Sequence, residues 1–179
     1  MKFKEENGVR IYQVPAADAV IDPHQEDCNY PYKELCGAGV AYKLVRVLLE
    51  ELEIDPAKAE YLIENVAIAT IGDVVNLTGE NRIFVRTGLE MLKKTKNEGL
   101  KALFECTGID VENLNTYHIG FVIGPCINAC GRLDTAKRAL ELLNAPGRRE
   151  AVMMAEDLKA LNESRKEMTE KGVERAVEM

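Results

Sequence analysis

The chain has 179 residues, enough for one domain with a buried core, and its hydrophobic fraction of 46% is typical of a globular protein rather than a disordered one. Only 6% of the residues are aromatic, there is no Trp, and the formal net charge is −7. This composition excludes a protein with a basic field over its whole surface, and it predicts no aromatic surface on which nucleic-acid bases stack.

The five cysteines predict reduced thiols and a cytoplasmic protein. Their number is odd, no two of them have CxxC spacing, and no signal peptide is visible at the start. No stretch approaches the roughly 20 apolar residues that span a membrane, so no membrane partner is expected.

The first part of the chain predicts short strands followed by a helix. Residues 9–14 alternate in the manner of a strand, and residues 18–22 form a second short strand. Residues 24–32 are interpreted as a polar loop, because their possible metal donors mix hard and soft ligands without metal-site spacing. From residue 37 to about residue 53, apolar residues recur with the period of a helix.

Asp73 has an unusual position in the sequence. It follows Gly72 at the end of an apolar stretch, in a helix that begins at Asp55-Pro56, and two valines come after it. Burying a carboxylate is costly unless a metal, a cationic side chain or free N–H groups meet it. Asp73 is therefore either a functional carboxylate or a cap for the turn that follows a helix ending at Gly72.

Three further helices are predicted from apolar spacing and from end signals. They cover about 81–94, 98–106 and 133–144, and the second ends at Gly108. Lysines gather at the C-terminal end of the first of them, where cations oppose the helix dipole. A solvated helix end explains these lysines better than a binding patch.

Residues 116–132 are apolar but interrupted by glycines, a proline, an Asn and an Arg. A buried Asn128 and a buried Arg132 require organised partners, and Arg is suited to binding a phosphate. Cys126 and Cys130 lack two further metal ligands and are interpreted as packing residues.

Residues 148–179 contain no Pro and predict one helix of some 30 residues, roughly 45 Å long at 1.5 Å per residue. Its apolar stripe is interrupted at Arg165 and at Gly172, and its last turns are polar nearly all round. A helix whose apolar face fades usually bridges to a second domain or to a partner chain.

Three stretches of the chain resemble the RecJ family, the single-strand-specific DNA exonucleases of the DHH phosphoesterase superfamily. They are residues 17–23 running on to 30–41, residues 69–75 (ATIGDVV) and residues 124–132 (GPCINACGR). The sequence LNESRK at 161–166 also looks like the start of that family's interdomain helix. The GPxINAxGR pattern is specific, whereas the other stretches would be weaker alone.

The resemblance implies a fold class and a domain organisation. The chain would be mainly α with one or two short N-terminal strands. Residues 1–146 would form the back part of an α/β DHH phosphoesterase domain, and residues 147–179 would form the long linker helix to the next domain.

The resemblance also implies a reaction and its site residues. RecJ-type enzymes hydrolyse phosphodiesters from the 5′ end of single-stranded DNA, with Mn²⁺ or Mg²⁺ activating water and neutralising charge on the phosphate. Asp73 matches a metal-ligand aspartate of this family, and Asn128 and Arg132 match positions that line the cleft near the substrate phosphates. Asp73 and Arg132 would be catalytic, and Asn128 and Arg132 would bind substrate.

The chain departs from the family in the motifs that it lacks. The paired aspartates, the Asp-His-His motif and the glycine-rich motif of the DHH-associated domain are all absent, and the two histidines are far apart. One metal ligand does not make a two-metal site, so the chain alone is expected to bind no metal and to be inactive. Besides single-stranded DNA, its expected partners are a companion chain or a second copy.

Two other functions stay open from the sequence. The first is another DHH-superfamily phosphodiesterase, of the nanoRNase or cyclic-dinucleotide type, although GPxINAxGR and the long helix favour RecJ. The second is a non-catalytic helical module that binds a partner through its terminal helix. In either case the acidic charge predicts weak DNA binding by this chain alone.

Overall fold

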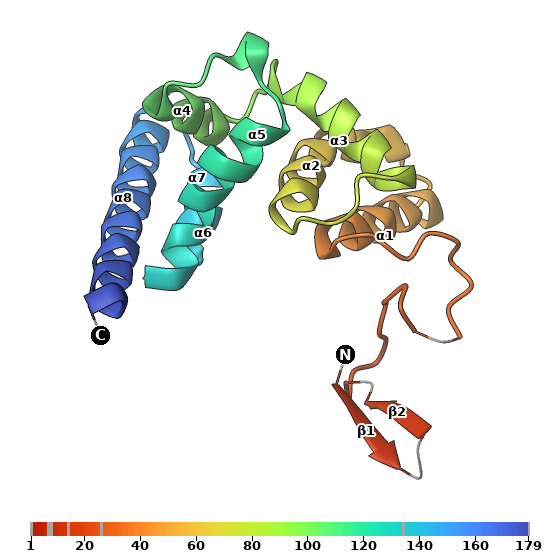
Figure 1. The fold of residues 1–179 in the computed structure, drawn as a ribbon. Coiled ribbons are helices and arrows are strands. Elements are labelled where there is room, and N and C mark those ends of the chain that lie inside the picture. The colour runs from red at the N-terminus through yellow and green to blue at the C-terminus, as the bar shows by residue number, and fades with distance from the viewer. Residues whose placement is uncertain (1, 7–8, 14, 26, 134, 179) are drawn as a thin grey trace. The chain divides into compact units, whose positions relative to one another are not determined.

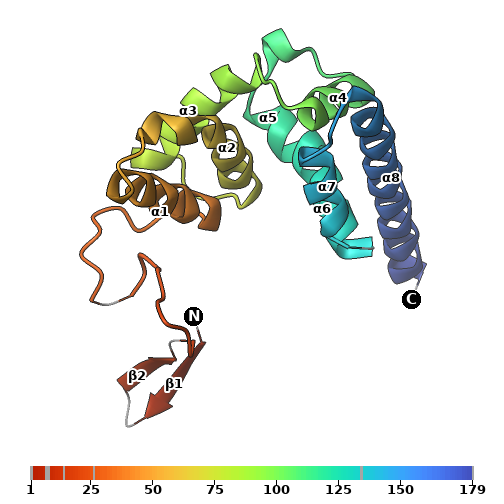
Figure 2. The ribbon, with the colours of Figure 1, turned by 180° about the vertical axis from the view of Figure 1, so that it is seen from behind.

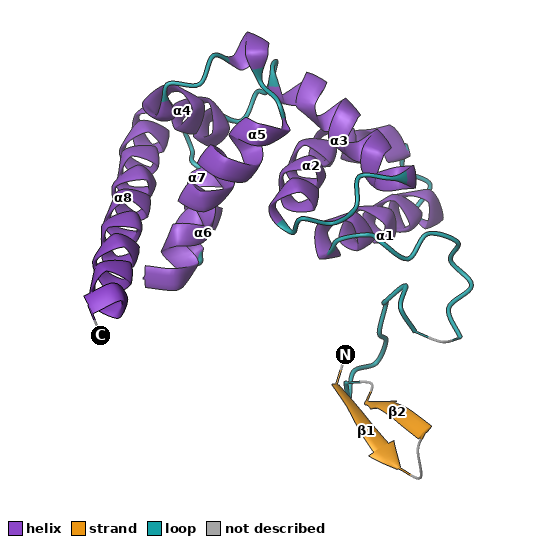
Figure 3. Ribbon diagram, in the orientation of Figure 1, coloured by secondary structure: helices purple, strands orange, loops and turns teal. Residues whose placement is uncertain are grey.

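The computed structural model describes residues 2–6, 9–13, 15–25, 27–133 and 135–178, and it describes the side chains of all of these except 2–6, 9–13, 132 and 133. The chain divides into two compact units, residues 1–33 and residues 34–179. Figure 3 shows strands only in the first unit and helices only in the second. The prediction of a mainly α chain is confirmed.

The first unit contains an antiparallel hairpin of β1 (Lys2–Glu6) and β2 (Val9–Gln13). The strand predicted at residues 9–14 overlaps β2, whereas the strand predicted at residues 18–22 is wrong, because these residues form no strand. They enter a turn in which the Asp22 carboxylate accepts from the His24 backbone N–H at 2.9 Å, and this hydrogen bond is the main cause that lowers the pKa of Asp22.

The second unit begins with helices that pack closely together (Figure 1). They are α1 (Gly37–Glu51), the 3₁₀ helix η1 (Pro56–Leu62), α2 (Ile63–Gly72) and α3 (Gly79–Leu92). A T-shaped contact between Tyr42 of α1 and Phe84 of α3 and an ion pair between Lys43 and Glu80 join the first and last of these helices. The outer face of α1 leaves large apolar side chains exposed: Leu44, Val47, Leu48 and Leu52.

The remaining helices enclose the larger part of the core. They are α4 (Glu98–Thr107), the 3₁₀ turn η2 (Val111–Asn113), α5 (Thr116–His118), the π-helical turn η3 (Ile119–Ile123), α6 (Gly124–Leu133), α7 (Lys137–Leu143) and α8 (Arg148–Glu178). Seen from both sides, α8 lies beside α4, α6 and α7 (Figures 1 and 2). The largest fully buried side chains that these helices contribute to the core are Leu100, Leu103, Phe104, Ile119, Ile123, Leu142 and Leu158.

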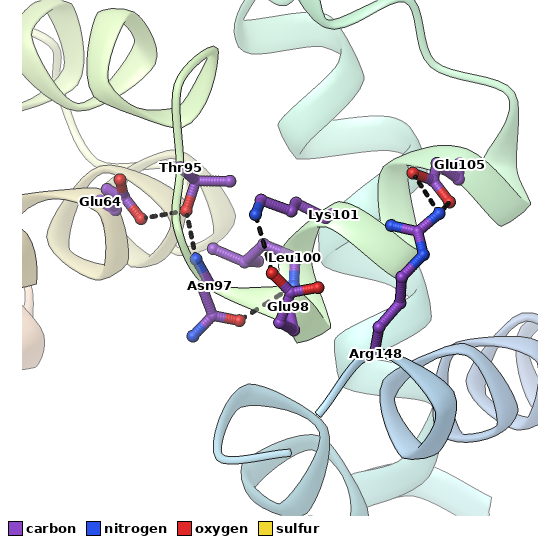
Figure 4. A network of polar contacts seen from close by, with 8 residues as sticks. All are labelled: Glu64, Thr95, Asn97, Glu98, Leu100, Lys101, Glu105 and Arg148. Carbon is purple, nitrogen blue, oxygen red and sulfur yellow. Dashed lines mark hydrogen bonds and ion pairs between the residues drawn. The ribbon is translucent and has the colours of Figure 1, made fainter. Parts of the chain in front are cut away.

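Polar contacts join α2 to α4 and α7 at the segment between α3 and α4 (Figure 4). The Thr95 hydroxyl donates to Glu64 of α2 at 2.6 Å and accepts from the Asn97 N–H at 3.2 Å. The Asn97 side chain caps α4 by accepting from the Leu100 N–H at 3.0 Å, and it donates to the Leu143 carbonyl of α7 at 2.8 Å. One short segment therefore fixes three helices relative to one another.

The sequence mispredicts the helices on either side of residue 134. Residues 116–133 run without interruption through α5, η3 and α6, and a new helix begins at Lys137 rather than at Leu133. The π-helical turn lies just before Pro125, whose missing N–H removes the ordinary helical hydrogen bond to the Phe121 carbonyl. The proline thus changes the helix register without ending the helix.

The predicted terminal helix is confirmed as α8, which covers 31 residues. Its buried residues, Ala151, Ala155, Leu158 and Asn162, all lie in its first half, and every described residue from 166 on is exposed. None of the helices in the described ranges has the length and apolar character needed to cross a bilayer.

Candidate functional site

Asp73 lies where the chain leaves the C-terminal end of α2. Its backbone N–H donates to the Ala69 carbonyl at 2.8 Å, and its side chain is exposed, so the expectation of an enclosed carboxylate is wrong. Gly72 ends the helix as predicted, but α3 begins only at Gly79, so Asp73 caps no following helix. An acidic group at a helix C-terminus is unfavourable, because the negative end of the helix dipole lies there. The stability of the fold therefore does not explain why a carboxylate stands at this position.

Val74, directly after Asp73, has a strained backbone. Its φ is 56° and its side chain is 88% exposed. A β-branched residue in the left-handed region is an outlier that costs about 1–3 kcal/mol, and such residues gather at functional sites. The sharp turn at Val74 takes the chain away from α2 and leaves the Asp73 carboxylate open to solvent.

We expect Val74→Asn to raise the free energy of unfolding by about 1 kcal/mol, because Asn tolerates the left-handed conformation and an exposed Val loses little burial. Denaturant unfolding followed by circular dichroism measures the change. Val173→Asn on α8, also exposed, is the matched control and should give no rise. A fall in stability for Val74→Asn would contradict the assignment of strain to this residue.

A small hollow lies between the C-terminal end of α2, the π-helical turn η3, α6 and α8. Its volume is ≈ 130 Å³, and its lining consists of Gly72, Gly120, Gly124, Pro125, Asn128 and Arg165. Asp73 directly follows the first of these residues. The structure thus brings the Asp73 segment and Asn128 to one place, although they are far apart in the sequence.

The polar residues and the cysteines of the GPxINAxGR stretch differ in their exposure to solvent. Asn128 is exposed rather than buried, because it lies on the face of α6 that opens to the hollow, so the sequence was wrong to expect it to be enclosed. The backbone of Arg132 lies one helical turn further along α6, and its side chain is outside the described part. Cys126 and Cys130 are buried, at 2% and 0% exposure, which confirms them as packing residues.

Arg165 of α8 is a residue of this hollow to which the sequence assigned no site role, although it interrupts an apolar stripe and lies in the LNESRK stretch. Its guanidinium donates twice to the Asn162 side-chain oxygen, from Nε at 3.2 Å and from Nη2 at 3.1 Å. Asn162 is itself buried and donates to the Cys126 Sγ at 3.7 Å. Burial raises the pKa of the Cys126 thiol, so at neutral pH this sulfur is uncharged and attracts no cation.

Two exposed aromatic side chains stack on each other near the start of the helix that runs from residue 116 to residue 133. Tyr117 and Phe121 are 62% and 68% exposed, and their rings are stacked with centroids 5.0 Å apart. They are four residues apart on the continuous helix, so they share one face. The low aromatic content of the sequence concealed this pair.

A larger hollow of the second unit lies elsewhere, between α2, α3 and α7. It has a volume of ≈ 1120 Å³ and is open to solvent, and its charged lining residues have both signs: Glu64, Arg86, Glu90, Lys94 and Lys96. None of the residues that the sequence assigns to a site lines it. Its size and mixed charge favour no particular ligand.

The donors present fit a divalent cation only in part. A carboxylate oxygen is the ligand type that Mg²⁺ and Mn²⁺ prefer, and the exposed Asp73 offers one such group. Among the described residues, however, no group of three or more His, Cys, Asp or Glu side chains comes together. Asp73 therefore fits as a single ligand, and the described residues do not complete a site around it.

Comparison with known proteins gives one consistent result. No protein-family model matches the chain. The single-stranded-DNA-specific exonuclease RecJ of Bacillus subtilis is 39% identical over 93% of this chain, which covers 20% of that protein. The crystal structure of exonuclease RecJ bound to manganese superposes with a TM-score of 0.80 and 32% identity over 92% of this chain and 41% of that one.

A second solved structure agrees with the first. RecJ from Thermus thermophilus in complex with Mg²⁺ has a TM-score of 0.75 and 32% identity, over 84% of this chain and 24% of that one. The chain thus spans between a fifth and two-fifths of the relatives that it matches. Sequence and fold agree over nearly its whole length, and the chain belongs to the RecJ family, in which it corresponds to a segment of the longer proteins.

Proposed function

We propose that this chain forms one wall of the active-site cleft of a RecJ-type exonuclease, which hydrolyses the phosphodiesters of single-stranded DNA in the 5′-to-3′ direction. The observation that carries the proposal is that Gly72, which directly precedes Asp73, lines the same hollow as Asn128. The two segments belong to two separate family motifs. The related proteins are named as single-stranded-DNA-specific exonucleases, and their solved structures hold Mg²⁺ or Mn²⁺.

In this proposal each residue has a separate task. Asp73 would hold a divalent cation, which when bound supplies activation of water and neutralises charge on the phosphate. Asn128 is exposed at the hollow and offers an amide that can donate to a phosphate oxygen. Arg132 would hold the phosphate by paired, charge-assisted hydrogen bonds.

We also propose the domain organisation that the resemblance implies. Residues 1–146 would be the back part of a DHH phosphoesterase domain, and residues 147–179 would lead to the next domain. The exposure of α8 supports the second assignment, because every described residue from 166 on, including Met168, Val173 and Val177, is left exposed by this chain. The related proteins carry the matching segment within one longer chain, so we do not propose a separate companion chain.

The alternatives receive less support. The relatives do not favour a nanoRNase or a cyclic-dinucleotide phosphodiesterase. A purely interacting module would leave the exposed Asp73 and the strained Val74 without a reason. Self-association through the exposed apolar face of α1 stays a prediction.

The test of this function is a segment exchange. Residues 1–179 would replace the matching segment of the Bacillus subtilis RecJ, and the release of nucleotides from 5′-labelled single-stranded DNA would be measured with Mn²⁺. We expect the exchanged protein, called the RecJ chimera below, to be active. A folded chimera without activity, judged against the unmodified parent, would contradict the proposal.

The 179-residue chain by itself is expected to release no nucleotides above background in the same assay. The reason is that the described residues provide one candidate metal ligand and no cluster around it. Increasing the Mn²⁺ concentration tenfold should not change this result. Robust release that Asp73→Ala abolishes would show that the chain alone assembles a complete site.

A further inference from the structure

We infer that Arg165 of α8 binds a phosphate of the substrate strand in the hollow that it shares with α2 and α6. The inference rests on the proposed function for the identity of the anion as a DNA phosphate. It adds to that function a residue outside the Asp73 and GPxINAxGR stretches. It also gives α8 a role in binding the substrate, in addition to its proposed role as the link to the next domain.

The first argument is that the Arg165 guanidinium is held in place and still has N–H groups available for a further acceptor. Of its five N–H groups, two donate to Asn162, which leaves three for another acceptor. Among the described residues, this guanidinium forms no other hydrogen bond. Since Asn162 is only 4% exposed, the group that orients the guanidinium is itself fixed by the core.

The second argument concerns charge. Asn162 is neutral, so its two hydrogen bonds orient Arg165 without compensating its positive charge. Within the described part of the chain, Arg165 forms no ion pair with a carboxylate. The residues one turn away on α8 are not acidic either: Leu161, Asn162, Met168 and Thr169. An oriented and uncompensated guanidinium is suited to an anion.

The third argument is the shape of the hollow. Glycines form three of its six lining positions, and a Cβ added to Gly72 would meet nothing within 4 Å. The missing side chains let a ligand approach the backbone closely. The hollow is small, with a volume of ≈ 130 Å³ against ≈ 1120 Å³ for the hollow between α2, α3 and α7. A compact anion such as a phosphate group suits it better than a base with its sugar.

The position of the hollow fits the reaction. Asp73 lies next to Gly72 in sequence, and Asn128 and Arg165 line the hollow from α6 and α8. A phosphate there would have a guanidinium and an amide as donors, and it would lie against the residue that precedes the proposed metal ligand. Because Asn162 both orients Arg165 and donates to the buried Cys126, it is a positioning residue in this account.

The inference is tested with the 179-residue chain and inorganic phosphate. Phosphate is titrated into the ¹⁵N-labelled chain while NMR follows the backbone amides of Gly72, Gly120 and Gly124 and the Nε–H of Arg165. We expect these signals to shift together and to saturate. Arg165→Ala should weaken the affinity at least about tenfold, since hydrogen bonds to charged groups are lost, and Arg165→Lys should weaken it less.

Arg175→Ala, which removes an exposed arginine from the same helix, is the matched control and should leave the affinity unchanged. A 5′-phosphorylated oligothymidylate should shift the same glycine amides and compete with phosphate. Shifts confined to the lysines at the end of α3, or a full response in Arg165→Ala, would overturn the inference.

The two proposals can fail separately. An active RecJ chimera together with no phosphate response at the hollow would refute the role of Arg165 and leave the proposed function standing. Saturable phosphate binding at the hollow together with an inactive, folded chimera would refute the nuclease function and leave the anion site standing.

Discussion

Asp73→Ala in the RecJ chimera is expected to lower Mn²⁺-dependent release of nucleotides from single-stranded DNA by at least about a hundredfold, the size of loss that follows removal of one preorganised electrostatic group. The carboxylate is exposed at the end of α2, so its removal costs no buried contact. The loss should therefore appear in the rate and not in the melting temperature. A higher Mn²⁺ concentration should recover part of the rate, because a weakened site fills at higher metal concentration.

Asp157→Ala is the matched control, since Asp157 is an exposed aspartate on α8. It should change the rate by less than about twofold, as expected for surface substitutions away from a site. An Asp73→Ala chimera that keeps the parent rate would show that the resemblance in this stretch does not extend to the role of the carboxylate.

Gly88→Ala is expected to be the most destabilising small substitution in the packing of α2 against α3. A Cβ at Gly88 would lie 2.3 Å from the Ala67 Cβ and 2.8 Å from the Ile63 carbonyl oxygen. The second atom belongs to the backbone, so the helices themselves would have to separate. We expect a loss of about 3 kcal/mol in the free energy of unfolding, the upper end of the usual cost of overpacking.

Thermal unfolding of the 179-residue chain measures this effect, with an expected fall of roughly 10 °C in Tm for a chain of this size. Gly172→Ala on α8 is the control, because a Cβ there would meet nothing within 4 Å. It should leave Tm unchanged or raise it slightly, since Ala favours a helix over Gly. Equal Tm values for the two variants would contradict the close approach of α2 and α3.

The helices that carry complete local signals could be predicted from the sequence. For α4, Asn97 caps the start and Gly108, with φ 71°, ends the helix in the left-handed conformation that Gly allows. For α8, an uninterrupted run of good helix formers gives the whole length. Residues 116–133 could not be predicted, because Pro125 usually ends a helix, whereas here a π-helical turn accommodates it.

The sequence could predict which residues belong to the candidate site, but not how exposed to solvent they are. Sequence motifs selected Asp73 and Asn128, and the structure brings their segments to one hollow. Both were expected to be buried and both are exposed, because the apolar residues around them pack inwards on the opposite faces of α2 and α6. Arg165 was not assigned to the site, because its place in the same hollow as residues of α2 and α6 depends on tertiary packing and not on its own stretch of sequence.

The central claim is that Asp73 holds a divalent cation in a RecJ-type cleft. The most direct test is Mn²⁺ binding to the RecJ chimera and to its Asp73→Ala variant, measured from the free Mn²⁺ signal in electron paramagnetic resonance. We predict that Asp73→Ala removes one bound Mn²⁺ or weakens its affinity at least about tenfold, the lower end of the loss seen when groups around a metal are removed. Identical Mn²⁺ binding by the two proteins would contradict the claim.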